Sequence, residues 1–189
     1  MNNDLIQVIM TRSSVRAFLD KPVSDETVEQ LLKAAMAAPS AKNSQPWAFV
    51  VIRDRALLKK LGESLPNAKM TATAPVAVVI CGVMEKTLPG EAREYWIQDA
   101  AAATENFLLA VHALGLGAVW TGVHPISERI RILKETLKLS GEQYKCILTR
   151  NKGEGLFIFG GTILPFVNRI DENTEVYKTI TTKVTEAME

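Results

Sequence analysis

Apolar positions along the chain follow two different patterns. Spacings of three and four residues predict amphipathic helices, and short continuous runs rich in valine and isoleucine predict strands buried on both faces. The helical pattern covers residues 5–11, 25–38, 56–65, 91–114 and 127–137. The strand pattern covers residues 47–52, 75–83, 118–121, 144–149 and 156–159, with a turn at 151–155 between the last two.

The mixed order of these elements predicts an α+β or α/β sandwich built on one central sheet. The helix expected at 91–114 is rich in alanine and would be about 36 Å long at ~1.5 Å per residue. A domain of this size does not usually need so long a helix for itself. Because its apolar residues cover more than one face, we expect either a buried core element or a subunit interface.

Composition narrows the class of protein. The 189 residues are 47% hydrophobic and 23% charged, which is typical of one globular domain spanning residues 1–189. A net charge of +1 gives no electrostatic reason to expect nucleic acid or an anionic membrane as the main partner. The first residues lack the basic region of a signal peptide, and the longest apolar run, at 75–83, is too short to cross a bilayer. We therefore expect a cytoplasmic protein.

The segment TRSSVR, residues 11–16, gathers hydrogen-bonding groups directly after the first predicted helix. Arg12 and Arg16 could simply favour the negative end of that helix and otherwise face water. With Ser13 and Ser14 between them, however, two guanidinium groups, two hydroxyls and closely spaced N–H groups could surround a phosphate. The segment is therefore a candidate phosphate site.

A second polar cluster, PSAKNSQPW at residues 39–47, lies between a helix and a strand. It could be an ordinary loop in which Trp47 joins the core. Ser40, Asn43 and Gln45 nevertheless offer a hydroxyl and two amides, each amide both a donor and an acceptor. Such groups can read the alternating carbonyls and N–H of a flavin pyrimidine edge. Together with a phosphate site, this cluster indicates a phosphorylated heteroaromatic cofactor, with flavin mononucleotide (FMN) the leading candidate.

Three weaker candidates follow. Lys69 could face solvent, or its ammonium group could stabilise the negative charge that a flavin collects near N1 on reduction. Gly122 could merely permit a turn, or Thr121 and Gly122 could direct their N–H groups toward a ring nitrogen. His112 and His124 have no third ligand at metal spacing, so no metal site is expected.

Taken in order, these motifs resemble the nitroreductase family of FMN-dependent NAD(P)H oxidoreductases. The resemblance covers about residues 4–140. It rests on the early R-S-S-x-R cluster, the S-x-x-N-S-Q-P-W loop before a strand, the lysine before an apolar strand, and the alanine-rich helix that runs into GLGAVWTG.

The resemblance implies a nitroreductase-like α/β sandwich with a mixed, mainly antiparallel sheet flanked by helices, in a domain-interlocked homodimer with two FMN sites built from both chains. Arg12, Ser13, Ser14 and Arg16 would hold the phosphate and ribityl region, with Lys69 near the pyrimidine edge. Thr121 and Gly122 would lie by N5, and the other subunit would bring Pro39, Ser40, Asn43 and Gln45.

The implied reaction is ping-pong. NAD(P)H, as NADH or NADPH, delivers hydride to flavin N5 and leaves, and a nitroaromatic, a quinone or a similar small molecule then takes two electrons. The flavin carries the chemistry, so no catalytic side chain is expected.

Residues 141–189 depart from the family pattern, because the usual Gly-Tyr-Pro-like turn and the basic residue after it are missing. Arg169 is a possible last phosphate contact. The altered end leaves two alternatives: an FMN storage or sensing protein without efficient turnover, and a dimeric scaffold whose polar loops bind nothing. NADH oxidation with a quinone separates an enzyme from a storage protein, and an absent flavin spectrum would indicate the scaffold.

Overall fold

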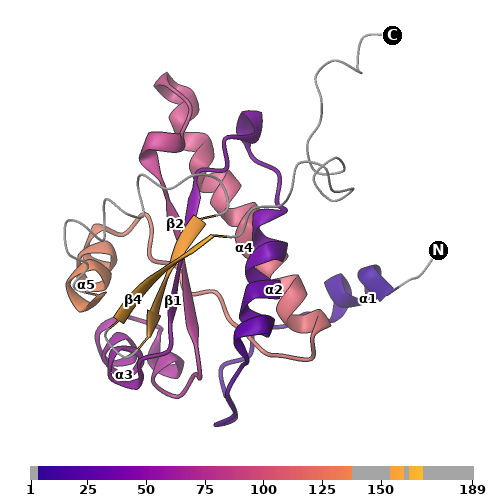
Figure 1. The fold of residues 1–189 in the computed structure, drawn as a ribbon, viewed down its shortest axis with the longest axis vertical. Helices are drawn as coiled ribbons and strands as arrows, with labels where there is room; N and C mark the ends of the chain where they lie inside the picture. The colour runs from indigo at the N-terminus through magenta and orange to yellow at the C-terminus, as the bar shows by residue number, and fades with distance from the viewer. Residues whose placement is uncertain (1–3, 138–153, 160–161, 168–189) are drawn as a thin grey trace.

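A four-stranded sheet forms the centre of the molecule, for which a computed structural model describes residues 4–137, 154–159 and 162–167 (Figure 1). The strands are β1 (Trp47–Ile52), β2 (Ala77–Gly82), β3 (Glu154–Phe159) and β4 (Thr162–Val167), in the spatial order β2-β1-β3-β4. β1 pairs antiparallel with β2 and parallel with β3, and β3 pairs antiparallel with β4. The sheet is therefore mixed and mainly antiparallel, as the family resemblance implied.

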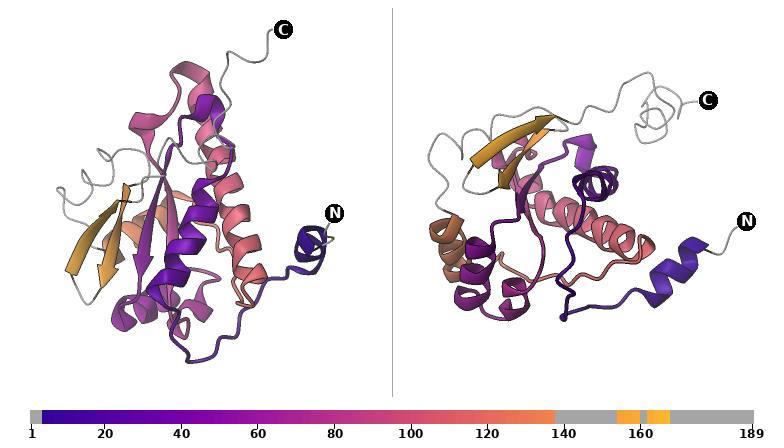
Figure 2. Two further views of the ribbon diagram at one scale, coloured as in Figure 1. Left: turned by 45° about the vertical axis from the view of Figure 1, so that its right-hand side comes forward. Right: turned by 60° about the horizontal axis from the view of Figure 1, so that its bottom comes forward.

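β1 lies inside the molecule, with all six of its residues buried. Its odd-numbered residues pack against α2 (Asp25–Met36) and α4 (Tyr95–Ala113), and its even-numbered residues pack against α3 (Arg55–Ser64) and α5 (Ser127–Leu137). Figure 2 shows the two helix pairs on either side of the sheet. Because successive side chains of a strand point to opposite faces, the continuous apolar run WAFVVI supplies both halves of the core.

Most helix boundaries match the sequence pattern. Ser24 caps α2, as expected, by accepting a hydrogen bond of 3.2 Å from the Thr27 N–H. The helix ends at Met36, two residues earlier than the prediction, and Pro39 follows in the loop. In α3, Asp54 is the capping residue, and its carboxylate accepts from the Leu57 N–H at 2.8 Å.

The long helix expected at 91–114 is divided in the structure. A 3₁₀ segment, η4 (Gly90–Glu94), precedes α4, which has 19 residues and a length of about 29 Å. Tighter 3₁₀ turns are common where α-helices begin, and the periodicity of apolar residues does not distinguish them. Ala103 is fully buried against β1, so α4 does serve as a core element.

The strand expected at 118–121 is absent from the described part of the chain, where that stretch forms a single parallel bridge between Ala118 and Ser14. The side chain of Trp120 is 52% exposed, so this apolar stretch runs over the surface. Conversely, the structure contains a strand, β4, that the sequence pattern did not predict, because Pro165 interrupts its apolar run. Proline is tolerated in edge strands, and β4 is the last strand of the sheet. The strand expected at 144–149 lies outside the described residues.

α1 (Asp4–Thr11) projects from the body of the molecule in both figures. None of its residues is buried, and its apolar side chains Leu5, Ile6, Ile9 and Met10 are between 48% and 77% exposed. Three further 3₁₀ turns complete the described fold: η1 (Ala41–Asn43), η2 (Lys69–Ala72) and η3 (Met84–Lys86). Among the described helices, none has both the length and the apolar character needed to cross a membrane.

Candidate functional site

The TRSSVR segment lies against the segment that follows α4. The Val15 N–H donates to the Ala118 carbonyl at 2.9 Å, next to the bridge between Ser14 and Ala118. This close approach needs a glycine at position 117, because a Cβ there would lie 2.9 Å from the Cβ of Val15. Two motifs that are far apart in the sequence are thereby held side by side.

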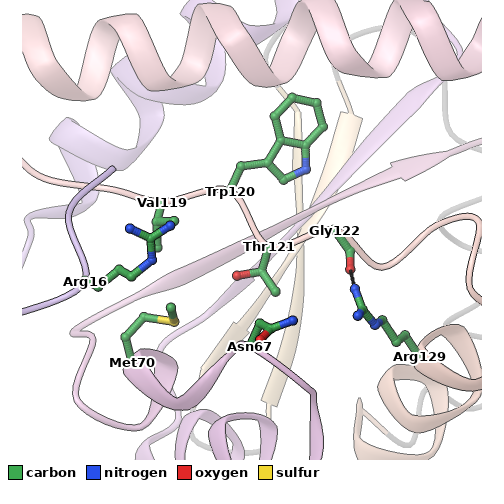
Figure 3. A pocket seen from close by; sticks show the side chains of 8 residues that line it. All are labelled: Arg16, Asn67, Met70, Val119, Trp120, Thr121, Gly122 and Arg129. Atoms are coloured by element: carbon green, nitrogen blue, oxygen red, sulfur yellow. Dashed lines mark hydrogen bonds between the residues drawn. The ribbon is translucent and has the colours of Figure 1, made fainter. Parts of the chain in front are cut away.

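A pocket of about 320 Å³ opens beside this junction (Figure 3). Its walls come from the TRSSVR segment, from the turn around η2, from the loop after α4 and from α5. The residues that line it are Arg16, Asn67, Met70, Val119, Trp120, Thr121, Gly122 and Arg129. We call it the Arg16 pocket.

Positive charge dominates the Arg16 pocket, because its lining holds two arginines and no acidic residue. The Arg129 Nη1 donates to the Gly122 carbonyl at 2.7 Å, and the Arg16 Nη1 lies 3.5 Å from the Ser14 carbonyl. Guanidinium groups remain protonated and carry several donors each, so the pocket is suited to an anionic ligand.

Gly122 faces open space. A Cβ at this position would meet no atom within 4 Å, and the backbone φ lies outside the left-handed region that favours glycine. The chain's own conformation therefore does not require a glycine at position 122. Close approach of a ligand would explain why a glycine is found there.

Arg12 does not share a pocket with Arg16. With Ser13 and His112 it lines a second, much smaller hollow of about 10 Å³, and its Nε lies 3.5 Å from the Glu105 carboxylate. The hydroxyl of Thr11 lies 2.8 Å from the His112 Nε2 and ties the end of α1 to α4. The two arginines that the sequence placed in one cluster thus line different hollows.

The 39–47 loop is held in shape by its own polar groups. The Ser40 hydroxyl accepts from the Gln45 N–H at 2.9 Å, the Gln45 side-chain amide donates to Asn43 Oδ1 at 2.9 Å, and the Ala41 N–H donates to the buried Asp99 at 3.0 Å. Asn43 and Gln45 have φ values of 52° and 47°. With Lys42 at 51°, three non-glycine residues of the loop lie in the left-handed region, which implies a loop whose shape is imposed by its surroundings.

Ser40, Asn43 and Gln45 do not line the Arg16 pocket. They precede the first residue of β1, which pairs with the last residue of β2, whereas η2 precedes the first residue of β2. The loop and η2 therefore lie toward opposite ends of the sheet. Lys69 is exposed in η2, beside the pocket residue Met70, and Pro39 is exposed at the start of the loop. Arg169 lies outside the described residues.

Sequence reasoning missed Asn67, Met70 and Arg129 as pocket residues. Asn67 has a φ of 61° and follows Pro66. Since asparagine after proline favours a turn, the sequence did hold a signal for it. Arg129 had none, because a basic residue in an amphipathic helix normally faces water.

Comparison with known proteins agrees with the motifs. The model of the Nitroreductase family matches residues 9–67 and 63–150. A protein of Archaeoglobus fulgidus, provisionally named NADH dehydrogenase/NAD(P)H nitroreductase, is 46% identical over 134 residues, covering 71% of this chain and 76% of the relative.

Solved structures give the same picture. A protein of Parabacteroides distasonis with the same provisional name has a TM-score of 0.69 and 39% identity, covering 74% of this chain and 80% of that one. A provisionally named nitroreductase of Desulfovibrio desulfuricans, solved in complex with FMN, has a TM-score of 0.62 and 36% identity, covering 73% and 76%. The sequence, the fold and the family model agree, and the chain belongs to the Nitroreductase family.

Proposed function

We propose that the protein is an FMN-dependent oxidoreductase that takes electrons from NADH or NADPH and passes them to a nitroaromatic, a quinone or a similar small molecule. Membership of the family supports this activity. So do a relative in Bacillus subtilis named FMN reductase [NAD(P)H] and the FMN complex of the Desulfovibrio protein. Both observations agree with an NAD(P)H-dependent flavin oxidoreductase.

The Arg16 pocket suits such a cofactor in charge. Arg16 stands at one wall, the lining holds no acidic residue, and a side chain at position 122 would meet no atom of the chain within 4 Å. Arg16 would hold the phosphate together with the neighbouring Ser14, since hydrogen bonds to a charged group contribute about 1.5–3 kcal/mol each. Ser13 lines the second hollow with Arg12 and would join the phosphate site together with that arginine. Thr121 and Gly122 would contact the ring.

Arg12 can join the phosphate site only by exchanging its ion pair with Glu105. That pair spans 3.5 Å, and the Glu105 side chain is about half exposed. Exposed ion pairs contribute at most about 1 kcal/mol, so a phosphate would replace the carboxylate at little cost. Lys69, next to the pocket residue Met70, would extend the positive surface toward the pyrimidine edge.

Bound FMN would supply the hydride chemistry, accepting two electrons from the donor and returning them to the acceptor. The side chains of this protein would bind and orient it. Asn43 and Gln45 already have their amides hydrogen-bonded to each other, so the loop that carries them is ordered before any ligand arrives. Such preorganisation lowers the entropic cost of binding.

A homodimer would complete the site. In one chain, the 39–47 loop and η2 lie toward opposite ends of the sheet, so a second chain would have to bring Pro39, Ser40, Asn43 and Gln45 to the ring. The exposed apolar side chains of α1 support this assembly, because a contiguous apolar surface is typical of a subunit interface. The cytoplasmic location, the single domain over residues 1–189 and the interlocked form of the dimer remain predictions.

The observation that carries the proposal is the meeting of Arg16, Thr121 and Gly122 in one pocket of a Nitroreductase-family chain. The test is an absorption spectrum of the purified protein, followed by NADH and NADPH oxidation assays with a quinone and a nitrofuran. We expect flavin absorbance and steady-state turnover. A yellow protein without turnover would indicate storage, and a protein that does not take up added FMN would refute the proposal.

A further inference from the structure

We propose that Arg129 is a positioning residue of the Arg16 pocket. It holds the Thr121–Gly122 segment through the Gly122 carbonyl and adds a second positive charge to the lining. The inference rests on the proposed function and deepens it, since it names a residue that prepares the site for an anionic cofactor.

The contact is direct. The Arg129 Nη1 donates to the Gly122 carbonyl oxygen at 2.7 Å, a short distance typical of a charged donor. Figure 3 shows the Arg129 side chain reaching from α5 to this oxygen, with Arg16 on the other side of Thr121 and Asn67. α5 is anchored in the core by the buried Leu137, so the guanidinium group is presented from a fixed element.

The Thr121–Gly122 segment needs such a restraint. Glycine has more backbone freedom than any other residue, and a Cβ at Gly122 would find nothing within 4 Å to pack against. The stretch 118–122 belongs to no strand among the described residues. Because the peptide bond is planar, holding the Gly122 carbonyl fixes the plane of the peptide that follows and restricts the ψ angle of Gly122.

The charge of Arg129 is also available to the pocket. Arg131 lies two residues after Arg129 in α5 and differs from it. It is paired with Glu128 at 2.6 Å and with Glu135 at 2.7 Å, so two carboxylates offset its charge. Arg129 instead donates to the uncharged Gly122 carbonyl, and the lining of the Arg16 pocket, within the described part of the chain, holds no carboxylate. A ligand that gains negative charge on reduction would be stabilised by this group.

The contrast between the two arginines supplies the experiment. The full-length variants Arg129→Met and Arg131→Met lose the same charge from the same helix, and only the first loses a pocket contact. FMN dissociation constants would be measured by flavin fluorescence, and the midpoint potential of bound FMN by dye equilibration. Thermal unfolding of each apoprotein would show whether the variants fold.

We expect Arg129→Met to weaken FMN binding at least tenfold and to lower the midpoint potential. Each tenfold loss of preference for the reduced cofactor corresponds to about 30 mV for a two-electron couple. Arg131→Met should stay within about twofold of the wild type. If Arg129→Met does not fold, Arg129→Lys decides. It keeps the charge but replaces the planar group, so affinity should fall while the potential stays near the wild-type value.

Two negative results have different meanings. If the wild type binds FMN and Arg129→Met or Arg129→Lys matches it in both affinity and potential, the role of Arg129 is refuted and the proposed function stands. If the wild type itself takes up no FMN, the proposed function fails and the inference fails with it.

Discussion

Replacing Gly122 by alanine should affect the stability of the apoprotein and its affinity for FMN in opposite directions. In the chain alone, the new methyl group would meet no atom within 4 Å, and φ at this position is not in the left-handed region. Alanine in place of a compatible glycine stabilises a protein by about 0.4–1 kcal/mol by restricting the unfolded chain. The apoprotein should therefore be as stable as the wild type or slightly more so.

FMN affinity should change in the opposite direction. If the ring lies against Gly122, the methyl group overpacks a filled site, which costs about 1–3 kcal/mol. That range corresponds to a loss of roughly 5- to 150-fold in the binding constant. Fluorescence titration of the apoprotein with FMN would measure it, with the melting temperature of the same sample as the stability readout.

Gly117→Ala is the matched control, because the same chemical change meets a different environment. Its Cβ would lie 2.9 Å from the Cβ of Val15, an atom attached directly to the backbone that cannot rotate away. We expect a loss of about 1–3 kcal/mol in apoprotein stability, or about 2–4 °C in melting temperature per kcal/mol. Unchanged FMN affinity in Gly122→Ala would refute the placement of the ring beside this residue.

Three further predictions concern the phosphate, the proposed dimer and the Cys81 thiol. Arg12→Ala with Arg16→Ala should weaken binding of FMN but not of riboflavin, which lacks the phosphate, and equal losses for both ligands in titrations would contradict the assignment. Leu5→Asp with Ile9→Asp should dissociate the proposed dimer in sedimentation experiments, because it places charge on the exposed apolar side of α1; an unchanged sedimentation coefficient would argue against that interface. Burial of the Cys81 sulfur raises its pKa to about 11, so the thiol should resist alkylation at pH 8 although the residue as a whole is only partly buried. The neutral thiol contributes to the free energy of unfolding, and this contribution is complete below pH 9 and should be lost as pH rises through 11. In Cys81→Ala, the free energy of unfolding should depend less on pH in this range.

The local elements of this protein could be predicted from its sequence because their causes are local. Residues 47–52 form the predicted strand, since a continuous apolar run favours burial on both faces, and Ser24 caps α2 with its hydroxyl, as predicted. The family followed from short motifs whose order and spacing are properties of the sequence. Arg16, Thr121 and Gly122, predicted as cofactor contacts from the same motifs, line one pocket.

The tertiary structure alone decided which of these groups meet. Arg12 and Arg16 are four residues apart in the sequence but line different hollows, because Glu105 of α4 attracts one of them and the turn around η2 faces the other. Arg129 reaches the Gly122 carbonyl only because α5 packs beside the loop after α4. Contacts of this kind depend on how distant segments pack, so the periodicity and local chemistry of a sequence do not predict them.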